Sequence, residues 1–563
     1  MNKFFFGLAL AVCLFSCQQT VNENPVGVLR DQAMVVTAHP LATHAGIEII
    51  KQGGNAFDAA TAIHFMLAVV YPRAGNIGGG GFAVIRHQDG EIAALDFREM
   101  APAKASETMY QDKSGQVIKD KSTLGHHAPG IPGSVAGIWE LHQKHGSVPW
   151  GQLIQPAIDV AFNGFKITSD EAEALNEKQS DFKKANNYQP WPIKVSGWKE
   201  NDIIIQKQLS ATLSFIRDRG RNGFYKGIVA DQIIKEIKQG GGIISKDDLI
   251  NYRSIWREPV VGTYKGHKVI GMPPPSSGGI ALLQLLQGAE QLNLGQYEHN
   301  SVEAVHLMAE LERRVFADRA MHLGDPDYFE VPQAQLLNDE YNLKRFDSIS
   351  MDHASTSETI QAGNFLLGES METTHYSIVD DQGNAISITT TLNGNYGSKV
   401  LVEGAGFFLN NEMDDFSAKP GVKNMFGLIG GKANAIVPGK RMLSSMTPTI
   451  VEKDGQLKMV LGTPGGPTII TSVFQTIINV IDHNMSMQSA VSSKKVHHQW
   501  IPDRILVEEG ALNNSQIEKL QSMGHHIEFR DKIGRTDCIL IRDDGQLEGG
   551  ADYTRGDDHA EGF

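Results

Sequence analysis

The pattern of hydrophobic and polar positions changes repeatedly along the chain, between a helical spacing of about 3.6 residues and a strand spacing of about two. Helical spacing predicts helices at about residues 44–52, 56–70 and 301–321. Alternation predicts strands at 82–87, 92–97, 373–379 and 385–391, and turn residues predict hairpins at 88–90, 380–383, 453–455 and 543–545. Strand pairs combined with long helices predict an α+β fold in which helices cover antiparallel sheets.

The hairpin predicted at 373–391 gathers hydroxyl side chains on one face. If Val379 lies opposite Ala385 across the turn, then Thr373 lies opposite Thr391. Because side chains alternate along a strand, the same face also carries His375, Ser377, Ser387 and Thr389. The other face is apolar and is expected to pack on helices: it carries Tyr376, Ile378, Ile386 and Ile388. A row of hydroxyls is ordinarily a solvated face, so the row alone does not indicate a site.

Charge and composition exclude several classes of protein. The chain of 563 residues has 51 Lys and Arg against 65 Asp and Glu, a formal charge of −14. It therefore lacks the basic character that nucleic acid or an anionic membrane surface attracts. Only three cysteines are present, and no cluster of Cys or His has the spacing of metal ligands. We expect no internal disulfide, no metal and no cofactor.

The first seventeen residues are typical of an export signal. The apolar run at 4–15 is shorter than the roughly 20 residues that a spanning helix needs. Leu14-Phe15-Ser16-Cys17 resembles a bacterial lipobox, in which Cys17 becomes the lipid-modified first residue of the mature chain. We expect a signal peptide at 1–16 and a periplasmic or cell-surface protein whose only membrane contact is this lipid. The alternative is a plain signal peptide in which Cys17 has no role.

The stretch before the hairpin suggests a use for its first hydroxyl. Residues 350–372 are rich in Ser, Thr, Glu and Gly and lack periodicity, as exposed loops do. A cut between Glu372 and Thr373 would give Thr373 a free α-amine with a pKa of about 7.7–8.0 beside its own hydroxyl. Such an amine can act as the general base that activates the hydroxyl as a nucleophile.

Seven motifs, in order, carry a resemblance to a known family. They are Asn76–Phe82, Asp96–Pro102, Pro273–Gly279, Thr373–Ser377, Leu409–Ser417, Leu443–Pro448 and Pro464–Gly466. Together they resemble the γ-glutamyltranspeptidase (glutathione hydrolase) family of N-terminal-nucleophile hydrolases. The resemblance implies a four-layer αββα sandwich, built as one body from two fragments of a single precursor. It also implies autocatalytic cleavage into a large subunit (17–372) and a small subunit (373–563).

The resemblance further implies an activity and a catalytic apparatus. The enzyme would cleave γ-glutamyl amides such as glutathione and pass the acyl group to water or to an amino acid or peptide acceptor. Thr373 would be the nucleophile and Thr391 the residue that orients it. The backbone N–H groups of Gly465 and Gly466 would form the oxyanion hole.

Two further sets of residues would bind the zwitterionic end of the glutamyl group. The α-carboxylate would be bound by Arg98, Ser444 and Ser445, and a guanidinium suits a carboxylate because it offers a planar fork of donors. The α-amino group would be bound by Asn393, Glu412 and Asp415. Taken singly, each of these residues is an ordinary surface or turn residue, and only their joint occurrence indicates a site.

The sequence departs from the family pattern at a few positions and leaves two other functions open. Glu412 stands where some members have Gln. Thr463 and Pro467 flank Pro464–Gly466, where Ser and another small residue are more usual. The stretch 420–434 resembles the family's lid loop, with Phe426 where Tyr is common. One alternative is an acylase for glutaryl amides, although such substrates lack the amino group that the second set would bind. The other is an inactive lipoprotein that uses the fold for binding.

Overall fold

The computed structural model describes residues 24–361, 373–417, 425 and 432–563, and its centre consists of two antiparallel seven-stranded sheets. Across sheet A the order is β1 (Val28–Arg30), β18 (Leu547–Ala551), β17 (Asp537–Ile541), β13 (Gln456–Leu461), β12 (Thr449–Lys453), β9 (His267–Gly271) and β8 (Val260–Tyr264). Across sheet B it is β19 (His559–Gly562), β2 (Met34–Thr37), β10 (Thr374–Val379), β11 (Ala385–Thr391), β3 (Gly80–Arg86), β4 (Ile92–Asp96) and β7 (Ile255–Arg257).

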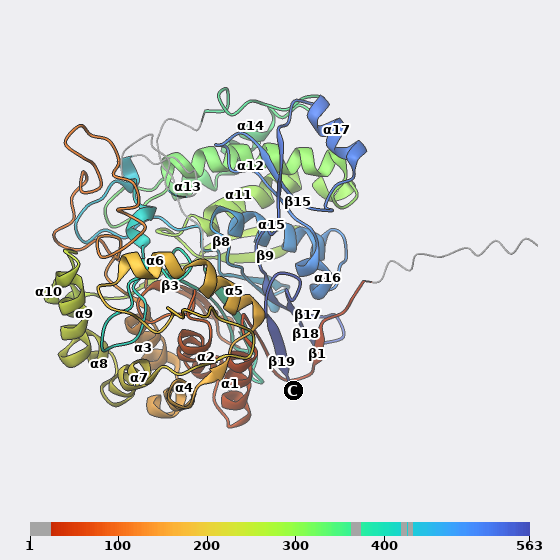
Figure 1. Ribbon diagram of the computed structural model, residues 1–563. Coiled ribbons are helices and arrows are strands. Elements are labelled where there is room, and N and C mark those ends of the chain that lie inside the picture. Colours follow the sequence, from red (N-terminus) through yellow and green to blue (C-terminus); the bar gives the residue numbers. More distant parts are fainter. Residues whose placement is uncertain (1–23, 362–372, 418–424, 426–431) are drawn as a thin grey trace, which may run out of the picture.

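The sheets pack face to face, and helices cover both outer faces (Figure 1). The core between the sheets includes Met34 and Val84 of sheet B and Ile270 and Val460 of sheet A. The core outside sheet B draws on α1 (Pro40–Lys51), α2 (Ala56–Val70), α3 (Ser134–His145), α4 (Trp150–Asn163), α7 (Lys207–Arg219) and α9 (Gly227–Gln239). The core outside sheet A draws on α11 (Gly278–Gln291), α12 (Val302–His322), α15 (Pro467–Ile481) and α16 (Met487–Ser492). The predicted αββα sandwich is confirmed.

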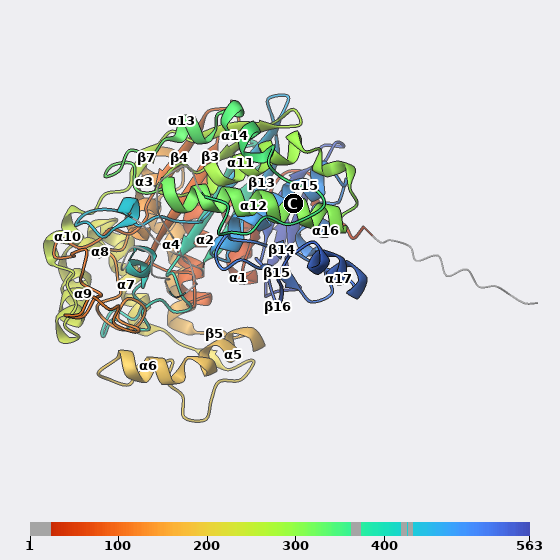
Figure 2. The same cartoon turned by 90° about the horizontal axis from the view of Figure 1, so that it is seen from above.

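Smaller elements surround these layers. The remaining helices are α5 (Ser169–Glu177), α6 (Gln179–Ala185), α8 (Asn222–Tyr225), α10 (Lys246–Asn251), α13 (Gln333–Leu336), α14 (Asp339–Phe346) and α17 (Asn514–Ser522). Two small sheets contain β5 (Phe165–Lys166) with β6 (Ile203–Ile204), and β14 (Val496–His497) with β15 (Ile505–Glu508) and β16 (Ile527–Arg530). Three short 3₁₀ helices are η1 (Leu294–Gln296), η2 (Glu412–Asp415) and η3 (Lys432–Asn434). Figure 2 shows α5 and α6 at the periphery. None of the described helices combines the length and apolarity that crossing a membrane requires.

The predicted helices form where the sequence carries end signals. Helix α2 covers the predicted residues 56–70, and Asn55 closes its first turn in a capping box with Asp58. Ser301 caps α12 by accepting a hydrogen bond from the Ala304 amide, as predicted. Helix α1 begins at Pro40, four residues earlier than expected, because a proline is well placed in a first turn.

Both sheets combine strands from before and after the predicted cut at 372/373. In sheet B, β10 lies between β2 and β11, and β11 lies between β10 and β3. In sheet A, β12 pairs with both β9 and β13. Strand pairing therefore holds the two parts in one body whether or not the peptide bond between them is intact.

The register of the β10–β11 hairpin is the predicted one, with Ser377 opposite Ser387 and Val379 opposite Ala385. The apolar face packs on α2 in the core outside sheet B, as expected. The hydroxyl face, in contrast, is not solvated, because sheet A covers it. The Ser377 hydroxyl donates to the Asp537 carbonyl (2.8 Å) and the Ser387 hydroxyl to the Leu461 carbonyl (2.8 Å). The hydroxyl row thus links the two sheets by hydrogen bonds across their interface.

We predict that Ser387→Ala lowers the free energy of unfolding by about 1–3 kcal/mol, because it leaves two buried backbone groups without a partner. These are the Leu461 carbonyl and the Thr449 amide, which donates to the Ser387 oxygen (3.0 Å). Denaturant unfolding would measure the change. The control is Ser522→Ala, which removes an exposed hydroxyl bonded to a backbone carbonyl and should cost less than about 0.5 kcal/mol. Equal effects of the two substitutions would contradict the inter-sheet role.

Candidate active site

One pocket brings together eight of the residues predicted to act on the substrate. Its lining consists of Arg98, Thr373, Thr391, Asn393, Glu412, Asp415, Ser444 and Ser445, together with Met446 and Ile469. These residues come from four separate regions of the chain, and they meet at one end of the two sheets. Of the predicted site, only the glycine pair and Glu372 are not in this lining, and Glu372 lies outside the described residues.

Thr373 and Thr391 lie together at the open end of the β10–β11 hairpin. Thr373 directly precedes β10 and is 6% exposed, and Thr391 is the last residue of β11. The amide of Asn393 donates to the Thr391 hydroxyl oxygen (2.7 Å), and Asn393 has a left-handed backbone with φ of 73°. Strand β3 pairs with β11, and the chain just before it runs close to Thr391, because a Cβ added to Gly79 would lie 2.0 Å from the Thr391 carbonyl oxygen. The glycine run 78–81 is therefore explained by close backbone packing.

Arg98 is the centre of the polar part of the pocket. Its side chain is buried, and its Nη1 lies 2.7 Å from Glu412 Oε2 while its Nη2 contacts Asp415. The Nη2 group also donates to the Leu443 carbonyl (3.1 Å). The residues expected to bind the two opposite charges of a substrate are thus ion-paired with one another. A zwitterion would fit such a site by exchanging partners, its carboxylate meeting Arg98 and its ammonium meeting the acids.

Burial raises the pKa of two carboxyl groups beside Arg98. The pKa of Glu412 is raised to about 8, mainly by loss of hydration, although the charge of Arg98 opposes the shift. The pKa of Glu99 is also raised to about 8 by burial, and its Oε2 lies 3.6 Å from Arg98 Nη1. A single guanidinium therefore faces three acids, and the cluster favours an additional cation.

Ser444 and Ser445 are held by a loop from elsewhere in the sequence. The motif 273–279 ends in α11, and the Ser277 amide donates to the Ser444 carbonyl (2.7 Å). The Ser277 hydroxyl donates to the same carbonyl (2.7 Å). Arg319, on α12, donates to the hydroxyl oxygens of both Ser445 (3.0 Å) and Ser277 (2.8 Å). The motif 273–279 is thus part of the support for the serine pair.

Gly465 and Gly466 lie at the start of α15, whose Ile469 lines the pocket. Gly466 is the N-cap of that helix, and both glycines have positive φ, 135° and 62°. Side chains rarely adopt such backbone angles, which explains the glycines. The N-terminus of a helix presents unpaired N–H groups and a positive dipole end, so this position suits a developing negative charge.

Three supporting residues were not predicted from the sequence. Asp96 accepts a hydrogen bond from the Arg98 amide (2.9 Å), and Asn434 joins the Asp415 carbonyl (2.5 Å) to the Leu443 amide (3.0 Å). The third is Arg319. It continues the i, i+4 series of Leu307, Leu311 and Val315, and a charge at the end of an apolar stripe was a signal that could have drawn attention to it.

Several predicted features fall outside the described residues. They are the signal at 1–16, the lipidated Cys17, the cleaved residue Glu372, and most of the expected lid loop, including Phe426. Within the described part of the chain, no three His, Cys, Asp or Glu residues are arranged to hold a metal ion.

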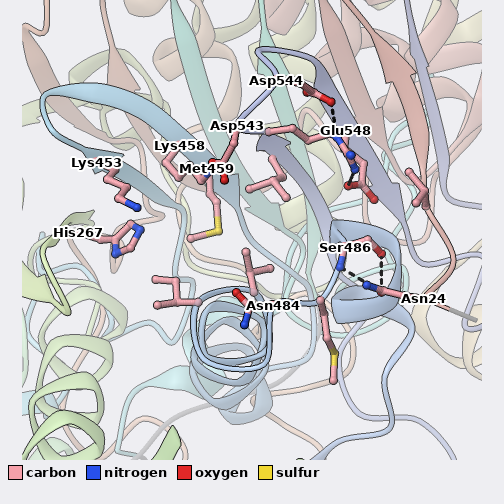
Figure 3. Close-up of a pocket in the computed structure, with 16 residues that line it drawn as sticks. Asn24, His267, Lys453, Lys458, Met459, Asn484, Ser486, Asp543, Asp544 and Glu548 are labelled. Carbon is pink, nitrogen blue, oxygen red and sulfur yellow. Dashed lines mark hydrogen bonds and ion pairs between the residues drawn. The ribbon is translucent and has the colours of Figure 1, made fainter. Parts of the chain in front are cut away.

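A larger cavity, of about 680 Å3, lies at the opposite end of sheet A (Figure 3). It opens between the β12–β13 and β17–β18 turns, and Figure 3 shows Lys453 beside His267 on one wall. None of the predicted site residues lines this cavity, and its size alone does not make it the site.

Comparisons with known proteins agree with this geometry. The sequence profile of the family described as Gamma-glutamyltranspeptidase matches residues 42–562. The chain is 42% identical over 538 residues to the Glutathione hydrolase proenzyme of Escherichia coli (strain K12), covering 94% of this chain and 92% of that one.

Two solved structures are similar in fold. The cephalosporin acylase from Bacillus halodurans superimposes with a TM-score of 0.84 at 25% identity, over 98% of this chain and 99% of that chain. The Helicobacter pylori γ-glutamyltranspeptidase chain has a TM-score of 0.57 at 42% identity, over 61% of this chain and 96% of that chain. The pocket, the profile match over nearly the whole length and these similarities lead to one conclusion: the chain belongs to the γ-glutamyltranspeptidase family.

Proposed function

We propose that this protein is a self-processing γ-glutamyltransferase and glutathione hydrolase, which cleaves γ-glutamyl amides through an acyl-enzyme on Thr373. The observation that carries the proposal is the pocket beside Thr373, in which a buried guanidinium and two serines face two carboxylates. Only a group that bears both an anion and a cation satisfies both sides of such a pocket. The α-carbon end of a glutamyl residue has that character.

In this proposal the glutamyl group displaces ion pairs within the pocket. Its α-carboxylate takes the fork of Arg98 and the hydroxyls of Ser444 and Ser445. Its ammonium takes the carboxylates of Glu412 and Asp415, with Asn393 beside them. The γ-carbonyl then extends toward Thr373. Partner exchange costs less than burying new charges, because the site is already desolvated and polar.

Processing precedes catalysis. The Thr373 hydroxyl attacks the carbonyl carbon of Glu372, and the peptide C–N bond breaks to leave an ester and a free α-amine. Water then hydrolyses the ester, which releases the carboxylate of Glu372 and the hydroxyl of Thr373. The expected fragments are 17–372 and 373–563. The solved Helicobacter pylori chain supports a division near this point. Almost all of that chain, 96%, matches 61% of the present chain, and residues 17–372 are also about three fifths of the present chain.

The same hydroxyl then acts on substrate. The α-amine of Thr373 accepts the hydroxyl proton while the oxygen attacks the γ-carbonyl, and Thr391 orients the attacking group. The N–H groups of Gly465 and Gly466 stabilise the oxyanion, where one donor is typically worth about 10²–10³ in rate. The amine part of the substrate takes the proton from the Thr373 α-amine and leaves. Water or an amino acid acceptor then attacks the acyl-enzyme to release the glutamyl group.

A second candidate function is an acylase for amides of a dicarboxylic acid such as glutarate. The close similarity in fold to a cephalosporin acylase favours it. A glutaryl group has the carboxylate but not the ammonium, however, so it would compete with Glu412 and Asp415 for the guanidinium of Arg98 and bring no cation to replace it. Unpaired buried charges cost more than the contacts that remain. The acidic side of the pocket therefore favours the γ-glutamyl substrate.

For location we propose export and attachment through a lipid on Cys17. The first described residues lie against the start of α16, where the hydroxyl of its N-cap Ser486 donates to the Pro25 carbonyl (2.5 Å) and the Ser486 amide donates to Asn24 Oδ1 (3.1 Å). A tether of seven residues, 17–23, would then separate the lipid from the body. Labelling with a radioactive fatty acid, abolished by Cys17→Ser, would test the anchor.

We predict that the purified protein runs on a denaturing gel as two fragments of 356 and 191 residues. Thr373→Ala should remain uncut and inactive, because it removes the hydroxyl that both processing and catalysis require. The matched control is Thr374→Ala, at the adjacent buried residue, whose hydroxyl has no hydrogen-bond partner among the described residues. It should be cut normally. An uncut control together with a cut Thr373→Ala would place the nucleophile elsewhere.

The function itself is tested by release of nitroaniline from three substrates. The γ-glutamyl anilide should be cleaved at least about a hundredfold faster, in kcat/KM, than the glutaryl anilide, which lacks the ammonium. The third, 4-aminobutanoyl anilide, lacks the carboxylate and should also be poor. Adding a dipeptide acceptor separates transfer from hydrolysis. A preference for the glutaryl compound would establish the acylase instead.

The raised pKa of Glu412 predicts a pH dependence of binding. Because the substrate ammonium binds the ionised carboxylate, KM for the γ-glutamyl anilide should fall by up to about tenfold per pH unit as pH rises toward 8. Glu412→Gln should weaken this dependence of KM, leaving the smaller part that Glu99 causes through Arg98, and should keep the rise of kcat that the Thr373 amine causes. Asp414→Asn, at a neighbouring acid bonded to Ser122 (2.5 Å), is the control and should behave as wild type. An unchanged KM profile in Glu412→Gln would contradict the assignment.

A further inference from the structure

Arg319 is a buried arginine whose donors reach the serine pair of the pocket. It projects from α12 and is 1% exposed. Its Nη2 donates to the Ser445 hydroxyl oxygen (3.0 Å) and its Nε donates to the Ser277 hydroxyl oxygen (2.8 Å). One guanidinium therefore joins a helix outside sheet A to a side chain that lines the pocket and to the loop beneath it.

The contact with Ser277 shows what Arg319 does to a hydroxyl. A serine oxygen accepts through its lone pairs and has one hydrogen to donate. At Ser277 the guanidinium occupies a lone pair, and the hydroxyl hydrogen is directed to the Ser444 carbonyl (2.7 Å). An arginine cannot accept a hydrogen bond, so a serine in contact with it must point its hydrogen elsewhere.

We propose that Arg319 is a positioning residue for the α-carboxylate, an inference that rests on the proposed function. By donating to Ser445, it turns the hydroxyl hydrogen of that serine away from α12 and into the pocket, toward the substrate carboxylate. Its positive charge also makes the serine a stronger donor, because it polarises the O–H bond. Through Ser277 it fixes the carbonyl of Ser444, so both serines are held in a donating arrangement.

A positioning role predicts selectivity between substrates that a purely structural role does not. Arg319→Met should raise KM about ten- to a hundredfold for the γ-glutamyl and glutaryl anilides, both of which carry the carboxylate. For 4-aminobutanoyl anilide, which lacks it, KM should change by less than about threefold. The value of kcat should change little for any of the three, because the chemistry at Thr373 is untouched.

Arg314→Met is the matched control. Arg314 lies on the same helix, is also 1% exposed, and likewise donates to a serine, Ser355 (3.1 Å), but Arg314 is paired with Glu310, and Ser355, unlike Ser445, does not line the pocket. Its loss should lower stability without changing the ratio of KM values among the three anilides. A similar change of ratio in Arg314→Met would assign the effect to the helix as a whole and would overturn the proposal.

A second measurement covers the case in which Arg319→Met is not processed, or in which the 4-aminobutanoyl anilide is cleaved too slowly to measure. Arg319→Lys keeps the charge but cannot donate to both serines, and it should show a smaller rise of KM. In a cycle with Ser445→Ala, the effects of Arg319→Lys and Ser445→Ala on KM should be non-additive, because the arginine acts through that hydroxyl. Additive effects, or equal losses on all three anilides, would overturn the inference.

Failure of the wild type to cleave γ-glutamyl anilide while it cleaves the glutaryl compound would contradict the proposed function. The test of Arg319 would still apply, because the glutaryl compound also carries the carboxylate.

Discussion

The buried guanidinium of Arg98 is the constraint on which the site depends. A charge removed from water must be paired, and Arg98 meets this requirement with Glu412 and Asp415 and with the carbonyl of Leu443. Arg98 and these partners come from three separate segments of the chain, at 98, 412–415 and 443, so the ion pairs draw these segments together over the end of the sheets. The same pairs supply a position for an anion and a position for a cation. Structure and recognition thus arise from one electrostatic requirement.

The proposed nucleophile is positioned by a different principle, the geometry of paired strands. Thr373 and Thr391 lie at the open end of the β10–β11 hairpin, and the register of that hairpin is set by the apolar face packed on α2. Sheet A covers the opposite face and bonds to its hydroxyls. Because the hairpin is held on both faces, the start of β10 stays in place even when the bond before Thr373 is broken. A terminal residue, ordinarily the most mobile part of a chain, is thereby held rigidly.

The similarity to an acylase shows how little of the specificity lies in the fold. The choice of amide depends on which charges the loops present. Here the acids beside Arg98 have raised pKa values because they are buried, and Arg319 supports the serine pair from behind. Specificity is therefore carried by charged residues on the loops and not by the two sheets.

The sequence alone determined the α+β class and the β10–β11 register, because these follow from local periodicity, and its motifs suggested the chemistry that we propose for Thr373. Through its resemblance to a family it also identified the pocket residues, and the structure brings eight of them together. Only the tertiary structure decided that the hydroxyl face is buried between sheets, because solvation depends on a second sheet that local pattern does not reveal. It alone showed that Arg98 pairs with Glu412 and Asp415, and that Arg319 contacts Ser445. Such contacts join residues more than a hundred positions apart, and their distances are set by packing.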